Sequence, residues 1–448
     1  MNNYTRLVDP RTGDECGQVA ISNEAAVNRA VDSAHKAFAS WSKSTSQERH
    51  DGLLALADAI SKHAEEIADV EVSNTGKSHE QVLNVEIPSA INELRFMAGA
   101  ARTLLSPGAG EYVPGHLSYA LREPVGVCAQ IAPWNYPFAM AVSKLAPALA
   151  MGNTVVLKPA ETTPLSAQIL VELCSKVFPK GVVNIVCGDR DTGRALVRHP
   201  RPALVSITGS STAGKQVALD ASATLKRLHL ELGGKAPAMV FADADLELAA
   251  DGIAGAAFYN GGQDCTAACR VLVAAQCYER FVELLVERAK ACQPDPLNSA
   301  AQLSRVAGFV ERLPAHASVR AGGSIREGGG FFYEPTVIVG VLQDDEVVQE
   351  EIFGPVITVQ PFDSEQHAVQ LANAVPFGLA ASIWTRDHGR ALRLPRLIDA
   401  GTVWVNCHSV LAAEMPFGGM KASGYGKDLS VLALDSYSRI KHVMSGSL

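Results

Sequence analysis

Residues 125–157 read VGVCAQIAPWNYPFAMAVSKLAPALAMGNTVVL, and this stretch decides the fold. A β-rich run at Val125–Ile131 is followed by a helical window at Ala139–Met151 and then by a second β-rich run at Thr154–Leu157. Strands that alternate with helices in this way form parallel sheets with helices packed on their faces. The stretch therefore predicts an α/β fold.

The same alternation extends on both sides of this stretch. Toward the N-terminus, apolar residues at helical spacing predict three helices at Glu24–Phe38, Ser46–Ala68 and Glu80–Leu104, the last kinked at Pro88 and ended by Pro107. Toward the C-terminus, the predicted elements are helix Leu165–Val177, strand Val182–Val186, helix Thr192–Arg198, strand Ala203–Thr208, helix Ala213–Ala223 and strand Arg227–Leu232. These elements predict one α/β domain that ends near residue 233.

A second set of α/β elements follows. They are helix Leu246–Tyr259, helix Tyr278–Ala291, strand Glu334–Val339 and strand Gly401–Asn406. Two segments stand outside them: Glu111–Arg122 has an extended pattern, and Leu432–Met444 alternates apolar and polar residues. Because an edge strand offers unpaired backbone groups, we expect the second segment to pair with another subunit. The chain is thus predicted to hold two α/β domains and a small β extension.

The composition points to small-molecule partners. The 448 residues are 47% hydrophobic and carry a formal net charge of -8, which gives no electrostatic reason to bind nucleic acid or an acidic membrane surface. Nine cysteines lack the paired spacing of zinc sites, so we expect no metal and a reducing compartment. The N-terminus lacks a signal-peptide pattern and no run is apolar enough to span a membrane, so the expected location is the cytoplasm.

Cys265 is the first candidate for chemistry. It follows Gly261-Gly262-Gln263-Asp264, a glycine-rich turn that exposes a thiol near backbone N–H groups. A thiolate in such a turn is able to attack a carbonyl carbon. The alternative is a small buried hydrophobe, which is the commoner role of a free cysteine. The assignment therefore depends on partners elsewhere in the chain.

Two partners follow predicted strands. Glu231 ends an apolar strand before Gly233 and Gly234, where a carboxylate suits a general base; the alternative is a surface carboxylate beside a turn. Asn135 lies in the stiff loop Pro133–Pro137, where its amide is able to donate to an oxyanion; the alternative is loop packing around the neighbouring tryptophan. A thiol, a base and an amide donor together are typical of acyl chemistry.

A cofactor site is indicated at two further strand ends. The predicted strand 203–208 leads into Gly209-Ser210-Ser211-Thr212-Ala213-Gly214 and a helix, whose first N–H groups suit a pyrophosphate. The spacing differs from GxGxxG, so an ordinary strand-to-helix turn is the alternative. Lys158 and Glu161 follow an earlier strand and suit ribose hydroxyls, with a solvated ion pair as the alternative.

These segments together resemble the aldehyde dehydrogenase superfamily over nearly the whole chain and in the family's order. The matching pieces are Pro133-Trp134-Asn135, Lys158-Pro159-Ala160-Glu161, Thr208-Gly209-Ser210, Glu231-Leu232-Gly233-Gly234-Lys235, Gly262-Gln263-Asp264-Cys265, Glu350-Glu351-Ile352-Phe353-Gly354-Pro355 and Pro416-Phe417-Gly418-Gly419. The resemblance implies a Rossmann-like NAD-binding domain (1–110 and 125–233), a catalytic domain (234–430) and an oligomerisation segment (111–124 and 431–448). It also implies a homodimer or a homotetramer.

The resemblance implies a role for each residue. Cys265 is the nucleophile, Glu231 is the base, and Asn135 forms the oxyanion hole with the Cys265 backbone N–H. The residues implied to contact the cofactor are Trp134 and Ser210 along its length, Lys158 and Glu161 at the adenosine ribose, Glu351 at the nicotinamide ribose, Phe353 beside the nicotinamide ring, and Gly209, Gly214, Glu231, Leu232 and Gly233 around them. Lys158 is counted with the catalytic residues as well. A carboxylate at Glu161 repels a 2′-phosphate, so the expected cofactor is NAD rather than NADP.

The implied reaction is attack of the Cys265 thiolate on an aldehyde, hydride transfer to NAD, and hydrolysis of the thioester. The pieces around Cys265 and residues 414–428 resemble bacterial γ-aminobutyraldehyde dehydrogenases, which implies oxidation of 4-aminobutanal (1-pyrroline) to 4-aminobutanoate in putrescine breakdown. The expected substrate-binding residues are Tyr136, Asp264, Thr266 and Phe417, with Asp264 as a counter-ion or, alternatively, only a cap of the turn.

Other functions remain open at this stage. Other aldehydes are possible substrates, namely betaine aldehyde, succinate semialdehyde and aromatic or aliphatic aldehydes. A thiol hydrolase without redox chemistry is the alternative from another class, but it leaves the Gly209 turn and Glu351 without a role.

Overall fold

A parallel sheet forms the centre of the first part of the molecule. The computed structural model describes residues 4–103 and 108–446, and within them this sheet has the order β19-β9-β8-β5-β6-β7. Its strands are β5 (Val127–Ile131), β6 (Thr154–Lys158), β7 (Val183–Ile185), β8 (Leu204–Thr208), β9 (Arg227–Glu231) and β19 (Gly424–Tyr425). All neighbours are parallel except β19, which pairs antiparallel with β9. The predicted Rossmann-like α/β fold is confirmed.

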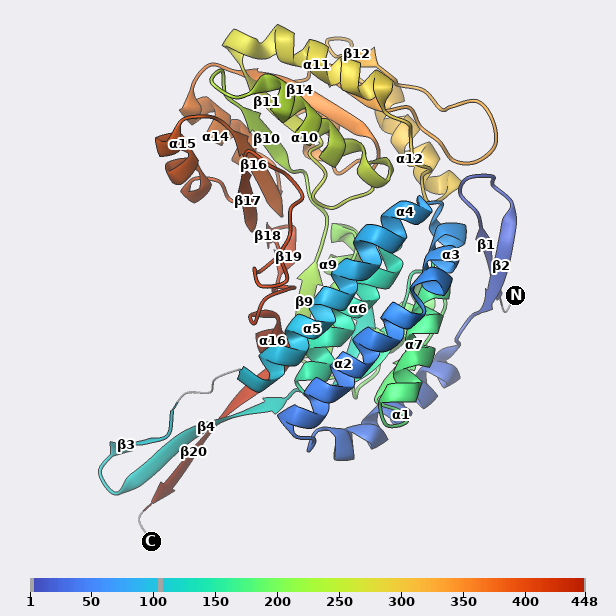
Figure 1. Ribbon diagram of the computed structural model, residues 1–448, viewed down its shortest axis with the longest axis vertical. Helices are drawn as coiled ribbons and strands as arrows, with labels where there is room; N and C mark the ends of the chain where they lie inside the picture. Colours follow the sequence, from blue (N-terminus) through green and yellow to red (C-terminus); the bar gives the residue numbers. More distant parts are fainter. Residues whose placement is uncertain (1–3, 104–107, 447–448) are drawn as a thin grey trace.

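Helices cover both faces of this sheet (Figure 1). They are α1 (Glu24–Trp41), α2 (Ser46–Lys62), α5 (Ile87–Thr103), α6 (Pro137–Ala150), α7 (Leu165–Val177), α8 (Arg190–Arg198) and α9 (Ser211–Ser222). Cys128 and Val155 face a core made with α2, α5, α6 and α7, whereas Val127 and Val156 face a core made with α1, α8 and α9. Alternate strand residues thus serve opposite layers, so the strands are apolar throughout.

Two N-terminal predictions need correction. The predicted helix Ser46–Ala68 breaks at His63: α2 ends at Lys62, and α3 (Ala64–Thr75) follows it and stops at Gly76 with φ +77°. The predicted helix 80–104 consists of α4 (His79–Gln81), a π-helical turn (Val82–Glu86) and α5. The irregularity thus lies before Pro88, because a wide turn accommodates a ring that has no N–H to donate. The predicted end at Leu104 and Pro107 lies outside the described residues.

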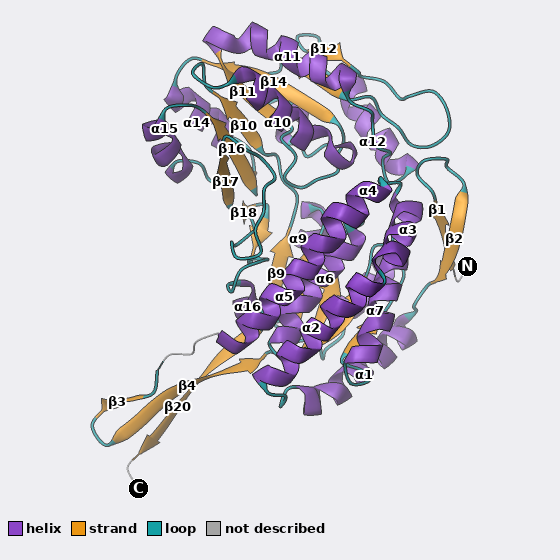
Figure 2. Cartoon of the chain, in the orientation of Figure 1, coloured by secondary structure: helices purple, strands orange, loops and turns teal. Residues whose placement is uncertain are grey.

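A second sheet lies above the first in Figures 1 and 2, with the order β12-β13-β14-β11-β10-β16-β17. Its strands are β10 (Pro237–Val240), β11 (Arg270–Ala274), β12 (Ser318–Ala321), β13 (Thr336–Val339), β14 (Val356–Phe362), β16 (Ala380–Trp384) and β17 (Thr402–Val405). Its helices are α10 (Leu246–Phe258), α11 (Tyr278–Ala291), α12 (Ala300–Glu311), α13 (Glu346–Gln349), α14 (Glu365–Asn373) and α15 (His388–Arg393). The expected second α/β unit is therefore present, although β19 from the predicted catalytic domain joins the first sheet.

The smaller elements complete the chain. They are the hairpin β1 (Tyr4–Val8) and β2 (Glu15–Ala20), the pair β15 (Phe377–Gly378) and β18 (Met420–Lys421), the short helix α16 (Ala433–Ser436) and three 3₁₀ turns at Tyr259–Gly262, Ala275–Cys277 and Leu394–Arg396. No helix in the described ranges has both the length and the apolarity to cross a membrane.

The predicted β extension projects from the rest of the molecule (Figure 2). It is a sheet of β3 (Gly110–Val113), β4 (His116–Pro124) and β20 (Ser438–Gly446), with β4 in the middle. The prediction of one strand over Leu432–Met444 is wrong in its first part, which includes α16, because the chain turns there to pack Ala433 and Leu434 into the core beside α6. β20 pairs with β4 of its own chain and remains an edge strand, so pairing with another subunit stays a prediction.

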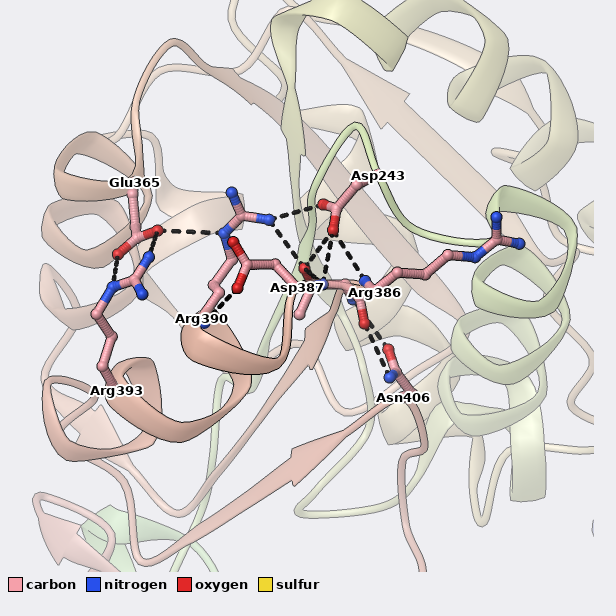
Figure 3. Close-up of polar contacts among 8 residues, drawn as sticks. Asp243, Glu365, Arg386, Asp387, Arg390, Arg393 and Asn406 are labelled. Atoms are coloured by element: carbon pink, nitrogen blue, oxygen red, sulfur yellow. Dashed lines mark hydrogen bonds and ion pairs between the residues drawn. The ribbon is translucent and has the colours of Figure 1, made fainter.

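A network of charged side chains fastens α14 and α15 to the second sheet (Figure 3). Asp243, in the loop after β10, accepts hydrogen bonds from the backbone N–H groups of Arg386 and Asp387 and from the Arg390 guanidinium. Glu365 on α14 accepts from Arg390 and Arg393 on α15. These contacts lie at the surface and hold the ends of the elements that surround the sheet.

Candidate active site

The candidate active site is assembled where the chain passes from the first sheet to the second. β9 ends at Glu231, and residues 232–236 lead from it to β10. Gly234 lies so close to the carbonyl of Cys265 that no Cβ would fit there. The glycine after the predicted base therefore brings the loop of the predicted nucleophile against the end of β9.

The loop before Cys265 is fixed by its backbone and by Gln263. Asn260, Gly261 and Gly262 have φ values of +51°, +63° and +69°, and Gly262 packs so closely on Gly354 that only glycine fits. The Gln263 amide donates to the carbonyls of Asn260 (2.8 Å) and Pro296 (3.1 Å) and accepts from the N–H of Asn298 (2.8 Å). Sequence analysis missed this supporting role of Gln263, which holds the loop from three sides.

Asn135 is brought to this loop as predicted. Its Nδ2 donates to the Gln263 carbonyl over 3.0 Å, and its own carbonyl accepts from Asn260 Nδ2 over 3.1 Å. The side chain is buried, so its orientation is set by these contacts. The Asn135 amide is thus held at the carbonyl of Gln263, which lies two residues before Cys265 in the chain. An oxyanion hole requires a donor that is fixed in this way.

The thiol of Cys265 has a raised pKa. Burial raises its pKa well above the ordinary value, and the carboxylates of Asp264, Glu351 and Glu231 raise it further. Because the thiolate is the nucleophile, the proton has to leave before attack on a carbonyl.

Glu231 has the properties of a general base for water. Its carboxylate is buried, and neither oxygen accepts a hydrogen bond from any residue that the structure describes. Gly418 packs against it, since a Cβ there would lie 2.5 Å from Oε1. Burial is the main cause that raises the pKa of Glu231 to about 7, with the Asp428 carboxylate adding to it. A carboxylate with a near-neutral pKa and free acceptor oxygens is suited to take a proton.

The predicted pyrophosphate turn adjoins Glu231. The Gly209 N–H donates to the Glu231 carbonyl over 3.0 Å, and Ser210 caps α9 by accepting from the N–H of Ala213 over 3.2 Å. Gly214 lets α9 approach β9, because a Cβ there would lie 2.5 Å from the Leu232 methyl groups. The glycine turn and the predicted base thus form one continuous surface.

Glu351 and Phe353 reach the same place from the second half of the chain. Glu351 Oε1 accepts from the N–H of Gly234 over 2.8 Å, and its carboxylate covers Gly233 so closely that a Cβ would not fit. Burial raises the pKa of Glu351 to about 7. Phe353 has φ +59° and packs edge-on against Trp134, with the ring centroids 5.2 Å apart. Both predicted cofactor aromatics are therefore in contact.

Lys158 does not join the catalytic group. Its Nζ lies 3.7 Å from the Glu161 carboxylate and donates to the Pro159 carbonyl over 3.2 Å. These contacts, rather than contacts with Cys265, are the ones the structure gives it, so the prediction that Lys158 is catalytic lacks support. Burial lowers the pKa of Lys158. The cofactor role of Lys158 and Glu161 stays a prediction.

Three of the predicted substrate residues form one hydrogen-bonded unit beside Cys265. The Tyr136 hydroxyl donates to Asp264 Oδ2 over 2.7 Å, and the Thr266 N–H and hydroxyl donate to Asp264 Oδ1 over 2.7 Å each. Lys77 Nζ lies 4.1 Å above the Tyr136 ring and forms a buried ion pair with Glu86 at 2.8 Å. Asp264 therefore does cap the turn, the alternative to the counter-ion role, and one face of Tyr136 already carries a cation.

The fourth predicted substrate residue, Phe417, lies on the Glu231 side of the site. Its N–H and carbonyl pair with the backbone of Asp428 at 2.9 and 2.8 Å, and the next residue is the Gly418 that packs on Glu231. All four residues are thus found next to Cys265 or Glu231.

A buried charged cluster behind Glu231 was missed by sequence analysis. It consists of His229, Asp428, Lys144 and Glu93. The signal for His229 is the alternation of β9, since residues 229 and 231 point to the same face of a strand. No local signal joins the other three to Glu231, because they come from an α6 position, an α5 position and a distant loop.

The fold and this site define a nicotinamide-dependent oxidoreductase that has a cysteine at its centre. The chain belongs to the aldehyde dehydrogenase family, whose profile, described as "Aldehyde dehydrogenase family", matches residues 2–443. It is an NAD-dependent aldehyde dehydrogenase.

Similar proteins are named for one aldehyde in particular. A betaine aldehyde dehydrogenase from Mesorhizobium japonicum is 39% identical over 453 residues, covering 98% of this chain and 93% of the relative. An NAD+ complex of an aldehyde dehydrogenase from Bacillus cereus has a TM-score of 0.97 at 38% identity, over 99% of this chain and 93% of that one. A betaine aldehyde dehydrogenase from Staphylococcus aureus with NAD+ has a TM-score of 0.97 at 34% identity, over 99% and 94%.

Proposed function

We propose that this enzyme oxidises an aldehyde that carries a cationic nitrogen to its free acid, with betaine aldehyde as the first candidate and 4-aminobutanal as the second. The observation that carries the proposed chemistry is the junction at Gly234, where the loop of Cys265 meets the end of β9 and its free Glu231 carboxylate. The names of the relatives favour betaine aldehyde, and the resemblance near Cys265 favours 4-aminobutanal.

The proposed reaction has three steps. The Cys265 thiol gives its proton to solvent water, its sulfur bonds to the aldehyde carbon as the C=O π bond breaks, and Asn135 Nδ2 with the Cys265 N–H stabilises the oxyanion. NAD, when bound, accepts the hydride from that carbon. Glu231 then takes a proton from water as the water oxygen bonds to the thioester carbon. The bond between that carbon and the Cys265 sulfur breaks, and the acid is released as product.

The residues around these groups fit the cofactor. A Cβ on Gly209 would meet nothing nearer than 3.7 Å, so the backbone of Gly209 and Ser210 at the start of α9 would be open to a pyrophosphate, with Gly214, Leu232 and Gly233 packed beside it. Lys158 and Glu161 would hold the adenosine ribose, Glu351 would hold the nicotinamide ribose, and Trp134 and Phe353 would flank the ring. Glu161 is exposed and disfavours a 2′-phosphate, which supports NAD over NADP.

The hydrogen bonds of Asp264 favour a quaternary ammonium over a primary one. Both oxygens of the Asp264 carboxylate already accept hydrogen bonds from Tyr136 or Thr266. A primary ammonium needs acceptors for its N–H groups, whereas a trimethylammonium group has none to satisfy and responds only to the charge. This difference supports placing betaine aldehyde ahead of 4-aminobutanal.

The test is to measure kcat/KM for a panel of aldehydes, with the absorbance of NADH as the readout. We expect the order betaine aldehyde, 4-aminobutanal, then succinate semialdehyde and uncharged aliphatic or aromatic aldehydes. Asp264→Asn should lower kcat/KM for the two cationic aldehydes about tenfold and leave an aliphatic aldehyde within twofold. Uncharged aldehydes ranking first would contradict the substrate proposal. A thiol hydrolase would release acid from a thioester without any NADH.

We also propose the division into NAD-binding segments (1–110 and 125–233), a catalytic segment (234–430) and an oligomerisation segment (111–124 and 431–448), in a homodimer or homotetramer. Leu117, Leu121, Ile440 and Met444 on β4 and β20 are each 42–52% exposed, which supports an interface on the extension. Light scattering should give a mass two or four times that of the 47.4 kDa chain.

A further inference from the structure

His229 lies directly behind the proposed base. It is fully buried on β9, two residues before Glu231 and on the same face of the strand. Its Nε2 lies 3.2 Å from Asp428 Oδ1 and 3.8 Å from Glu231 Oε1. One ring nitrogen thus faces two carboxylates, of which one belongs to the proposed base.

The charges around the ring favour the imidazolium. The titratable groups facing it are Glu231 on β9 itself, Asp428 from the loop after β19, Lys144 from α6 and Tyr437 after α16, with Glu93 from α5 behind Lys144. Burial alone would lower the pKa of His229, but the two carboxylates outweigh it and raise this pKa to about 9. His229 also lowers the pKa of Asp428.

The side chains of His229, Glu231 and Asp428 are also of the types that bind a metal ion. Ligand atoms of His229, Glu231 and Asp428 lie within 4.8 Å of one another. The ammonium of Lys144, which donates to Ser206 Oγ over 3.1 Å, adds a positive charge beside them. With His229 protonated, two cations already balance two carboxylates, and a divalent ion would add charge that nothing offsets.

The surrounding backbone fixes the ring and the carboxylate. A Cβ on Gly426 would lie 2.8 Å from Cδ2 of His229, and one on Gly418 would lie 2.5 Å from Glu231 Oε1. Asp428 is held by its backbone pairing with Phe417. The backbone at Gly426 and Gly418 thus packs directly against the ring and the carboxylate.

We propose that His229 is a positioning residue for Glu231: its imidazolium, anchored by Asp428, holds the Glu231 carboxylate in place and keeps it ionised and ready to take a proton from water. This role rests on the proposed function of Glu231 as the base for thioester hydrolysis. His229 itself gives up no proton in the cycle. Its contribution is electrostatic, because an adjacent positive charge stabilises the ionised form of a buried carboxylate.

The test compares His229→Gln and, in case that variant does not fold, His229→Asn. The readouts are the NADH burst, which reports attack and hydride transfer, and the pH profile of the steady rate, which reports hydrolysis when hydrolysis is slow. Removing the cation should move the ascending limb of the hydrolysis profile upward by about one pH unit and slow hydrolysis at pH 7 about fivefold, with an unchanged burst amplitude.

Controls separate this role from packing and from the proposed function. Tyr437→Phe keeps a ring against His229 and should leave the pH profile unchanged. His229→Gln in a Glu231→Gln background should slow hydrolysis no further. A wild-type pH profile in both His229 variants, with Glu231→Gln slow, overturns this inference alone. Wild-type hydrolysis in Glu231→Gln overturns the base assignment itself.

Discussion

Two clusters of charged side chains lie in comparable positions, each beside the end of a β-strand, and they are built in opposite ways. In the surface network of Figure 3, Asp243 accepts from Thr385, Arg386, Asp387 and Arg390 at 2.7–2.9 Å. In the buried cluster, both oxygens of Glu231 accept nothing from the described residues. The hydrogen bonds of the surface network lower the pKa of Asp243, whereas burial raises that of Glu231.

The difference separates a structural carboxylate from a reactive one. A carboxylate whose acceptors are all occupied has no orbital left for a proton from water, and its low pKa makes it a weak base. A buried carboxylate without donors costs folding free energy but is a stronger base. The surface network therefore favours stability, whereas the buried cluster keeps, at a cost in stability, the free acceptor oxygens that the proposed reaction requires.

The largest expected effect tests the reactive half of the comparison. Glu231→Gln removes the proposed base while keeping its shape, so the steady rate of NADH formation should fall at least about a hundredfold. The first turnover should survive as a burst of one NADH per site, because attack and hydride transfer precede hydrolysis. Rapid-mixing absorbance measures both. Asp243→Asn, the matched change in the surface network, should keep the wild-type rate; equal steady rates in all three proteins would contradict the assignment.

The second effect is a pH dependence of the unfolding free energy that runs in opposite directions for Glu231 and Asp243. The folded-state pKa of Glu231 is raised from 4.5 to about 7, so its contribution to stability is present below pH 4.5 and is lost as the pH rises through 7. The folded-state pKa of Asp243 is lowered, so its contribution is present above 3.8 and is lost in acid. Relative to wild type, Glu231→Gln should gain on the order of 3 kcal/mol between pH 4.5 and 8.

Chemical denaturation at a series of pH values measures this dependence. Asp243→Asn serves as the control, since it should show no such gain and should differ from wild type less as the pH falls toward 3. A stability difference between Glu231→Gln and wild type that stays constant from pH 4.5 to 8 would mean that Glu231 is not the unpaired carboxylate that the structure indicates.

The third effect concerns the stability of the surface network at neutral pH. Asp243→Asn keeps one acceptor oxygen but loses the charge and the other oxygen, so either the two backbone N–H groups or the Arg390 guanidinium lose their acceptor, which should lower the free energy of unfolding by about 2 kcal/mol. Asp32→Asn is the control, because Asp32 is an exposed residue paired only with Arg201 at 3.3 Å, and it should cost under about 0.5 kcal/mol. Equal losses would show that occupied acceptors do not distinguish Asp243.

The comparison also shows how far the sequence leads. The glycine turns alone did not distinguish Glu231 and Cys265 from structural residues, and the ordered motifs of the family resemblance singled them out; the alternation of strands and helices predicted the sheets. His229 was within reach of the strand alternation. The importance of His229 could not be predicted from the sequence, because it depends on Asp428 and Lys144. These two residues lie far from His229 in the sequence, and only the pairing of β19 with β9 and the packing of α6 on the sheet bring them to it. The π-helical turn before Pro88 was not predicted either, because the sequence marked only the proline and not the wide turn that accommodates it.

The smallest expected effect lies at the rim of the surface network. Arg393 donates to Glu365 through Nε and Nη2 at 2.7 Å, but about half of its side chain is exposed. Arg393→Ala should therefore cost about 0.5–1 kcal/mol of unfolding free energy, and the cost should shrink in 1 M salt, because exposed ion pairs are screened. Arg393→Lys keeps the charge but loses the two-pronged contact, so it separates geometry from charge. Suppose that the loss of unfolding free energy in Arg393→Ala were independent of salt and equal to that in Asp243→Asn. The Glu365 pair would then behave like the hydrogen-bonded Asp243 and not like an exposed, screened ion pair.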